Sequence, residues 1–202
     1  MSLDLWNNRF AGETYVFGEE PNAFLARQRA RLPRSGRALA VADGEGRNGV
    51  WLAQQGLSVH SIDGSSVAQE KAGRLAATRG VALELELADL SDWSWPEATY
   101  DVVAAIFIQF AGPELRAATF DGMKRCLKPG GLLLIEGYRP EQIAYGTGGP
   151  RVVENLYTEA MLAEAFAEFE ILELAAYDAE IQEGPGHSGM SALVDLVARK
   201  PA

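Results

Sequence analysis

Apolar runs of strand length alternate along the chain with segments of helical composition, and glycine or proline marks most junctions between them. The predicted strands are a run beginning at Arg37, then 57–62, 82–87, 102–107, 132–136, 169–177 and 192–198. The predicted helices are 20–32, 47–55, 65–79, 113–127 and 158–167. Seven strands separated mainly by helices predict an α/β fold with a doubly wound, mostly parallel sheet.

The patterns also predict where some strands lie in the sheet. Residues 82–87 alternate Leu with Glu, which predicts an edge strand with one solvent-facing side. Residues 102–107 are continuously apolar, which predicts a central, buried strand. No helix separates the last two predicted strands, so we expect the last strand to be antiparallel to its neighbour.

Length and composition favour a single domain over residues 1–202, since 48% hydrophobic content is ample for one core. Within it we expect an N-terminal lid and helix in 1–32 and a Rossmann-like core in 37–200. Residues 1–19 carry aromatic side chains but no strand or long helical period of their own. Residues 138–155 have no periodicity and are expected to form a long loop.

Charge and cysteine content exclude several classes of function. The chain has 28 acidic against 18 basic residues and no block of Lys or Arg, so we expect no nucleic-acid partner. No segment resembles a membrane span or a signal peptide, which predicts a cytoplasmic protein that binds no membrane. Cys126 is the only cysteine, so an internal disulfide and a cysteine-rich metal site are excluded, and we expect no metal. A monomer and a homodimer both stay open.

A glycine loop follows the first predicted strand and opens a helix, with the sequence Asp43-Gly44-Glu45-Gly46-Arg47-Asn48-Gly49. The next strand ends at Asp63. Glycines let the backbone approach a ligand closely, and an acid at the next strand end can accept hydrogen bonds from ribose hydroxyls. The pattern therefore predicts a nucleoside cofactor, and its literal form, G-x-G-x-x-G with an acid after it, is the dinucleotide fingerprint.

Charge decides against a dinucleotide. A pyrophosphate on the helix N-terminus would face Asp43 and Glu45 within one turn, on a chain of net charge −10. S-adenosylmethionine has a cationic sulfonium and ammonium and no phosphate, so it tolerates these acids while still requiring the glycines and Asp63. We therefore expect S-adenosylmethionine as the cofactor.

At these residues the chain resembles the class I S-adenosylmethionine-dependent methyltransferases. The run Gly44 to Asn48 followed by Trp51-Leu52-Ala53 resembles their tellurite-resistance, thiol-methyltransferase-like type, and Leu127 to Gly131 matches the turn that precedes the family's fifth strand. The resemblance implies that Gly44 and Gly46 cradle the methionine part, that Asp63 holds the ribose and that Asp89 accepts from the adenine amino group beside the amide of Leu90. It also implies a site that includes Arg47, Asn48, Ser65 and Ile106. The alternatives are a turn role for Asp63 and a cap or solvated position for Asp89.

The chain departs from the family at the acid that stands two residues before the first glycine, where it has Ala42, with Asp43 following. Neighbouring residues of a strand point to opposite faces. Two arrangements follow from this. Either Asp43 lies beyond the strand end, where alternation no longer applies, or backbone carbonyls near Ile106 hold the methionine ammonium.

The acceptor is less well defined by the sequence. Residues 107–110 read Phe-Ile-Gln-Phe in place of the Asn/Asp-Pro-Pro-Tyr/Phe run of amide and nucleobase methyltransferases, which favours an acceptor that is already nucleophilic. By resemblance, His187 faces the substrate. The residue after it is Ser188 where such relatives often carry Arg, which weakens the case for tellurite itself. Arg139, after the fifth strand, is a second candidate for the acceptor pocket. For both residues the alternative is an ordinary loop position.

The sequence thus predicts methyl transfer to a small soft nucleophile, such as a thiol or a selenium or tellurium anion, or to another small metabolite. Two other functions stay open at this point. One is a nicotinamide-dependent oxidoreductase, based on the literal glycine fingerprint. The other is a module that binds S-adenosylmethionine without catalysis.

Overall fold

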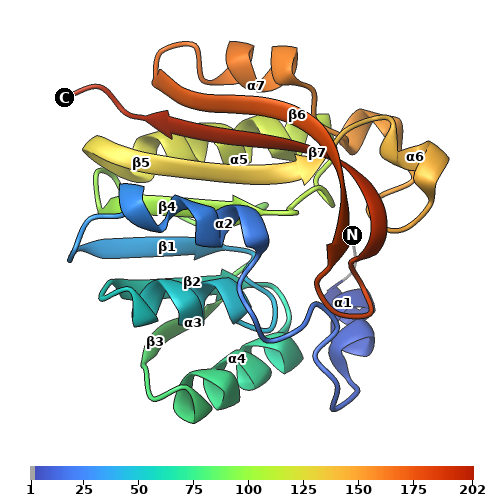
Figure 1. Ribbon diagram of the computed structural model, residues 1–202. Coiled ribbons are helices and arrows are strands. Elements are labelled where there is room, and N and C mark those ends of the chain that lie inside the picture. The colour runs from blue at the N-terminus through green and yellow to red at the C-terminus, as the bar shows by residue number, and fades with distance from the viewer. Residues whose placement is uncertain (1–2) are drawn as a thin grey trace.

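The structure, a computed structural model, describes residues 3–202 and forms one sheet with helices on both faces (Figure 1). Met1 and Ser2, which begin the predicted lid, lie outside the described residues. The strands are β1 (Arg37–Val41), β2 (Ser58–Asp63), β3 (Leu83–Leu87), β4 (Tyr100–Ile106), β5 (Leu127–Tyr138), β6 (Glu170–Gln182) and β7 (Ser188–Arg199). The α-helices are α1 (Leu3–Phe10), α2 (Ala23–Arg27), α3 (Arg47–Gln54), α4 (Ser66–Thr78), α5 (Pro113–Cys126), α6 (Gln142–Tyr145) and α7 (Glu159–Ala165). Two short 3-10 helices are η1 (Gln28–Arg31) and η2 (Val153–Asn155).

The sheet has seven strands in the order β3-β2-β1-β4-β5-β7-β6, which confirms the predicted doubly wound, mostly parallel, Rossmann-like class. β7 is antiparallel to both β5 and β6, whereas β1 to β5 pair in parallel. β3 lies at an edge and β4 lies inside the sheet, as the two apolar patterns predicted. The order reverses between β1 and β4, and in such sheets ligands bind beyond the carboxyl ends of the strands at that reversal.

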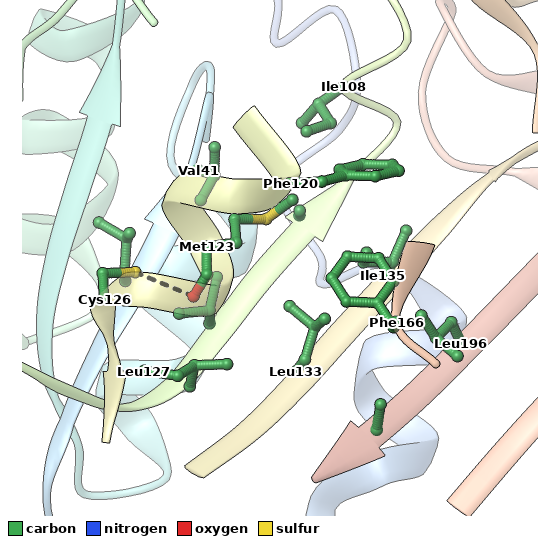
Figure 2. Close-up of a cluster of buried hydrophobic side chains, with 14 of the residues drawn as sticks. Val41, Ile108, Phe120, Met123, Cys126, Leu127, Leu133, Ile135, Phe166 and Leu196 are labelled. Carbon is green, nitrogen blue, oxygen red and sulfur yellow. Dashed lines mark hydrogen bonds between the residues drawn. The ribbon is translucent and has the colours of Figure 1, made fainter. Parts of the chain in front are cut away.

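Alternation along the strands divides the core into two layers. On one face, Leu39 and Val41 of β1 contact a layer that includes Phe120 and Met123 of α5 and Phe166 after α7. Figure 2 shows Phe120 and Met123 beside Leu133 and Ile135 of β5. On the other face, Ala38 and Ala40 pack with side chains of α2 and α3, namely Phe24, Leu25 and Leu52. The period of two therefore places successive residues of β1 in different layers.

Two predicted elements differ in detail because of local hydrogen bonds. The predicted helix 20–32 begins later than expected, because Asn22 caps it by accepting from the amide of Leu25 at 2.9 Å. The helix α2 therefore starts at Ala23. The Lys128–Gly131 segment, expected as a turn before the fifth strand, lies inside a longer β5. There the register with β4 shifts, and Gly130 has a φ of +74°.

The edge strand β3 follows its predicted alternation at its start and departs from it toward its end. Leu83 packs against the core while the Glu84 side chain is exposed, as the alternation predicts. Leu85 and Leu87 are 39% and 60% exposed, whereas Glu86 is half-buried and accepts from the indole N–H of Trp93 at 2.9 Å. At this end of the edge strand both sides are therefore partly open to solvent.

The N-terminal segment contains α1, which the sequence did not predict because eight residues are too few for a clear helical period. β6 and β7 extend beyond their predicted bounds and form a long hairpin whose tip reaches toward α1 (Figure 1). The amide of Gly186 in that tip donates to the carbonyl of Val16 at 2.7 Å. Segments from the two halves of the sequence thus meet above the sheet. Within residues 3–202, no helix has the length and apolar character required to cross a membrane.

Candidate cofactor and acceptor cleft

A cleft opens at the carboxyl ends of β1, β2 and β4, where the strand order reverses. It brings together nine residues that the sequence predicted for the site: Asp43, Gly44, Arg47, Asn48, Asp63, Asp89, Leu90, Ile106 and His187. Three predicted residues do not line it: Gly46, Ser65 and Arg139.

The end of β1 settles where Asp43 lies. Ala42 has a φ of +47°, so the chain leaves the extended conformation before Asp43 and strand alternation no longer applies. The Asp43 carboxylate accepts from the amide of Gly49 at 3.1 Å and from the Ser61 hydroxyl at 2.8 Å. Burial raises the pKa of Asp43 to about 7. Of the two arrangements that the sequence left open, Asp43 beyond the strand end is the one observed.

Asp63 joins the glycine loop to the end of β2. One carboxylate oxygen accepts from the amide of Gly44 at 2.8 Å, and the other accepts from the amide of Ser65 at 2.8 Å. Burial raises the pKa of Asp63, and these two amide hydrogen bonds oppose that shift. Each carboxylate oxygen has more than one lone pair, so both can accept a further hydrogen bond from a ligand.

Asp89 and Leu90 follow β3 at the same edge of the sheet. Asp89 is exposed, and the amide of Ser91 donates to its carboxylate at 2.9 Å. This hydrogen bond lowers the pKa of Asp89, so the group is ionised at neutral pH. Leu90 is buried beside it. The cleft therefore has an acidic group at each of three successive strand ends, those of β1, β2 and β3.

The three predicted residues outside the lining have other contacts. Gly46 has a φ of +88°, and a Cβ built there would lie 2.6 Å from Ala72 Cβ, so it allows close packing of the loop on α4. The Ser65 hydroxyl caps α4 through the amide of Ala68 and donates to Asn7 Oδ1 at 2.7 Å. Arg139 pairs with Asp178 and Glu141, away from the cleft.

The other end of the cleft is walled by aromatic rings from three separate parts of the chain. Phe17 and Phe107 lie on either side of His187, each with its ring centroid 4.4 Å from the imidazole centroid. Phe107 has a φ of +56°, a conformation that aromatic residues rarely adopt and that marks functional sites. The remaining rings that line the cleft are Trp6, Phe10 and Phe110, of which Phe10 also borders the glycine loop, 3.7 Å from a Cβ built at Gly44.

His187 is 93% buried among these rings, since only 7% of its surface is exposed. Burial, with a smaller contribution from the nearby guanidinium groups of Arg47 and Arg9, lowers its pKa to about 3. The imidazole is therefore neutral at neutral pH. Its Nδ1 has no hydrogen-bond partner among the residues that the structure describes.

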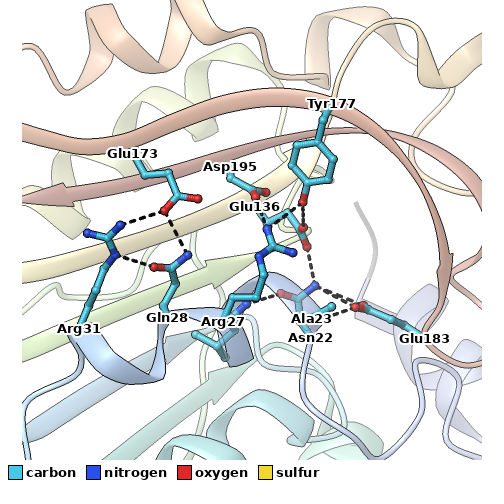
Figure 3. A network of polar contacts seen from close by, with 11 residues as sticks. Asn22, Ala23, Arg27, Gln28, Arg31, Glu136, Glu173, Tyr177, Glu183 and Asp195 are labelled. Atoms are coloured by element: carbon cyan, nitrogen blue, oxygen red, sulfur yellow. Dashed lines mark hydrogen bonds and ion pairs between the residues drawn. The ribbon is translucent and has the colours of Figure 1, made fainter.

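Sequence reasoning missed the polar network that surrounds the cleft. Arg47 pairs with Glu183 at 2.7 Å, and Asn22 donates through its side chain to Glu136 and through its backbone amide to Asn48 Oδ1 at 3.0 Å. Figure 3 shows Asn22 and Arg27 facing acids of β5 and β7 and of the hairpin. No periodic pattern marks these positions. Two acids in otherwise apolar predicted strands, Glu136 in 132–136 and Asp195 in 192–198, were the available signals.

Glu136 and Asp195 are direct neighbours across β5 and β7, and both side chains are buried. Burial and the neighbouring carboxylate raise the pKa of Glu136, and burial raises the pKa of Asp195 to about 6. Arg27 pairs with Asp195 at 2.8 Å. This network fixes α2 against the sheet next to the start of α3, which carries Asn48.

Comparison with known proteins agrees with the fold and the cleft. Residues 38–131 match the model of a family described as a methyltransferase domain. Comparison with curated protein sequences finds no match. The fold is similar to that of a structure solved in work on conversion of a disulfide bond into a thioacetal group during echinomycin biosynthesis, with a TM-score of 0.79 and 18% identity over 98% of this chain and 91% of that chain.

Two further solved structures share the fold. TehB from Haemophilus influenzae is 17% identical, with a TM-score of 0.73 over 98% of this chain and 66% of that chain. The N-methyltransferase NodS from Bradyrhizobium japonicum WM9, in complex with S-adenosyl-L-homocysteine, is 14% identical, with a TM-score of 0.70 over 99% of this chain and 98% of that chain.

The match to a methyltransferase domain over residues 38–131, the strand order and the cleft at its reversal agree with one another. The fold that the chain shares with NodS, which was solved with S-adenosyl-L-homocysteine, agrees with the predicted cofactor.

Proposed function

We propose that this enzyme transfers the methyl group of S-adenosylmethionine to a small soft nucleophile, such as a thiolate or a selenium or tellurium anion. The observation that carries the proposal is the contrast between the two ends of the cleft. One end presents carboxylates and a glycine loop, and the other presents aromatic rings around a neutral histidine.

The residues at the acidic end fit the cofactor. A Cβ built at Gly44 would meet only the Phe10 ring, at 3.7 Å, so the loop leaves room for a ligand. In our proposal Asp63 accepts from the ribose hydroxyls, Asp89 accepts from the adenine amino group, and the amide of Leu90 lies beside the adenine. Asp43 and Asp63 also complement the positive charge of the sulfonium and the ammonium.

The aromatic end supports an acceptor that is already nucleophilic. A histidine whose pKa is about 3 is a poor proton acceptor at neutral pH, so this site is ill suited to deprotonating a weakly acidic acceptor. The Arg9 guanidinium lies 5.0 Å from the Phe17 ring centroid, and this cation supports an anionic acceptor, whereas Arg47 in the cleft lining is paired with Glu183. The chain's net charge of −10 also favours a small molecule over a nucleic acid.

Catalysis in this proposal depends on alignment. A lone pair of the acceptor forms a bond to the methyl carbon while the bond from that carbon to the sulfonium sulfur breaks, and S-adenosylhomocysteine leaves. Holding the three atoms in line supplies up to roughly 7 to 11 kcal/mol in favourable cases. The rings of Phe17, Phe107 and Phe110 exclude water, which strengthens the attraction between an anionic acceptor and the cationic donor.

One comparison and the division of the chain complete the proposal. The structure solved in work on echinomycin concerns sulfur chemistry, which supports a sulfur acceptor here. We also propose that the whole chain acts as one domain, in which residues 1–32 form the lid and first helix and 37–200 form the core.

The test combines binding with turnover. Calorimetric titration of the protein with S-adenosylhomocysteine and with NAD should give binding of the first only. Turnover should then be measured on thiols, selenite, tellurite and small phenols, and we expect methylated products from the thiols or the chalcogen anions. Binding of NAD in place of S-adenosylhomocysteine would support the oxidoreductase. Binding of S-adenosylhomocysteine without turnover on the panel would contradict the proposed acceptor class and support a non-catalytic module.

A further inference from the structure

A buried ion pair joins the glycine loop to α4. Lys71 Nζ lies 2.5 Å from Glu45 Oε1, and the two side chains are 1% and 2% exposed. Glu45 stands between Gly44 and Gly46 in the loop, and Lys71 comes from the middle of α4. Neither residue was predicted for the site. Burying two charges is costly, and an apolar pair of similar volume would often stabilise a fold equally well.

Both charged groups hold the backbone of the N-terminal segment. The ammonium group of Lys71 donates to the carbonyls of Gly12 and Thr14, each at 2.8 Å. The second carboxylate oxygen of Glu45 accepts from the amide of Val16 at 2.7 Å. The Tyr15 hydroxyl donates to the carbonyl of Lys71 at 3.0 Å. The ion pair therefore fixes a stretch of chain that has no regular secondary structure of its own.

This stretch, residues 12–17, carries one wall of the aromatic end. Phe17 follows the clamped amide of Val16 and lies 4.4 Å from His187, measured between ring centroids. Phe10 precedes the stretch, and its carbonyl lies 3.5 Å from Lys71 Nζ. Glu45 lines the cleft, as do Phe10 and Phe17. One ion pair thus connects the loop at the donor end to the rings at the acceptor end.

We propose that Glu45 and Lys71 are positioning residues for methyl transfer, which fix residues 12–17 so that Phe10 and Phe17 close the acceptor end over the glycine loop. The inference rests on the proposed function, because it assumes that the acceptor binds beside His187. A loosened segment would leave the donor residues in place but would widen the acceptor end and admit water.

The test uses the double variant Glu45→Gln/Lys71→Met, which removes both charges and leaves no unpaired buried ion. Its global unfolding should stay close to that of the wild type, whereas Lys71→Met alone should lower the unfolding temperature because it leaves Glu45 buried without a cation. In the double variant, with S-adenosylhomocysteine bound, we expect hydrogen exchange of residues 12–17 to rise. We expect the KM for the acceptor to rise and kcat to fall, each by about tenfold, with S-adenosylhomocysteine affinity within about threefold of the wild type.

A matched control is Asp101→Asn/Lys128→Met, which removes an ion pair of 2.8 Å at the start of β4 and β5. This control should change neither the exchange of residues 12–17 nor turnover. Wild-type exchange and turnover in Glu45→Gln/Lys71→Met would overturn the positioning role. Loss of turnover that only parallels a loss of global stability would also overturn it.

The positioning role and the proposed function can fail separately. The acceptor class is judged by the turnover of the wild type on the panel. The positioning role is judged by the exchange of residues 12–17 in the double variant, which needs only S-adenosylhomocysteine, together with the division of the effect between KM and kcat.

Discussion

The donor end and the acceptor end of the cleft are built in different ways. At the donor end, each group follows its own strand: Asp43 comes after β1, Asp63 ends β2 and Asp89 comes after β3. At the acceptor end, rings from the N-terminal segment and from the turn after β4 converge on His187, which the β6–β7 hairpin carries. The donor groups are therefore placed by the sheet, whereas the acceptor groups depend on contacts between distant segments. Substitutions at the acceptor end can therefore change which acceptor binds without disturbing the donor end.

The donor end and the acceptor end also differ in charge. The donor end has two buried carboxylates, those of Asp43 and Asp63, and the exposed carboxylate of Asp89, and the pKa of Asp43 rises to about 7 because of burial. The acceptor end has a neutral imidazole between apolar rings, near two guanidinium groups. Variants at one end should therefore change a different quantity from variants at the other, and the following predictions use that difference.

Deletion of residues 1–18 should have the largest effect, because it removes Trp6, Phe10 and Phe17 from the acceptor wall together. We expect turnover to fall by about a hundredfold or more, since the cleft is then open to water. S-adenosylhomocysteine affinity, measured by calorimetry, should fall much less. If affinity and turnover fall equally, the N-terminal segment contributes to both ends and the division does not hold.

Asp63→Ala should weaken S-adenosylhomocysteine binding by about 1 to 3 kcal/mol, because the ribose hydroxyls lose their acceptor. The KM for the acceptor should change little. Calorimetry gives the affinity, and circular dichroism checks the fold, since the amides of Gly44 and Ser65 also lose a partner. Asp121→Ala, an exposed acid of α5, is the control and should bind normally. Unchanged affinity in folded Asp63→Ala would remove this residue from the site.

His187→Ala should lower turnover by about tenfold while leaving S-adenosylhomocysteine affinity nearly unchanged, because in our proposal the imidazole contacts the acceptor and not the donor. His187→Phe retains a ring between Phe17 and Phe107 and separates packing from polar contact. Recovery of turnover in His187→Phe would assign His187 a packing role. Full turnover in His187→Ala across all acceptors would exclude it from the acceptor end.

A smaller effect concerns stability and pH. The folded-state pKa of Asp195 is about 6, above its ordinary value of 3.8, so the folded protein binds more protons than the unfolded chain between these values. This group therefore lowers the free energy of unfolding as pH rises from about 4 to 6. The free energy of unfolding of Asp195→Asn and of the wild type should be measured with denaturant at pH 4.5 and at pH 7.5. The value for the variant minus that for the wild type should be larger at pH 7.5 than at pH 4.5, by on the order of 1 kcal/mol. An equal difference at both pH values would contradict the raised pKa.

The sequence predicted the donor end well because its signals are local. Gly44, Asp63 and Asp89 each stand at or just after the end of a predicted strand, and the strand order brings them together as expected. The predicted helix 65–79 begins as α4 one residue after Ser65, whose hydroxyl caps that helix and donates to Asn7 but does not line the cleft. Gly46 also does not line the cleft, because α4 fills the space beside it.

The acceptor end could be predicted only in part. His187 lines the cleft, whereas Arg139 pairs with Asp178 of β6 and does not line the cleft. Lys71 lies in a helix whose pattern gives no sign that its ammonium is buried, because the partners come from residues 12–14 and from Glu45. Contacts of this kind depend on packing between segments far apart in sequence, and no local pattern encodes them.

The left-handed backbone at Phe107 has a consequence for laboratory evolution. A bulky residue with a φ of +56° costs on the order of 1 to 3 kcal/mol, so glycine at this position is expected to relieve that cost. A selection for heat resistance alone would therefore favour variants that discard the aromatic ring beside His187. Thermostable descendants of this protein should keep their cofactor affinity while losing acceptor turnover, unless the selection also demands product.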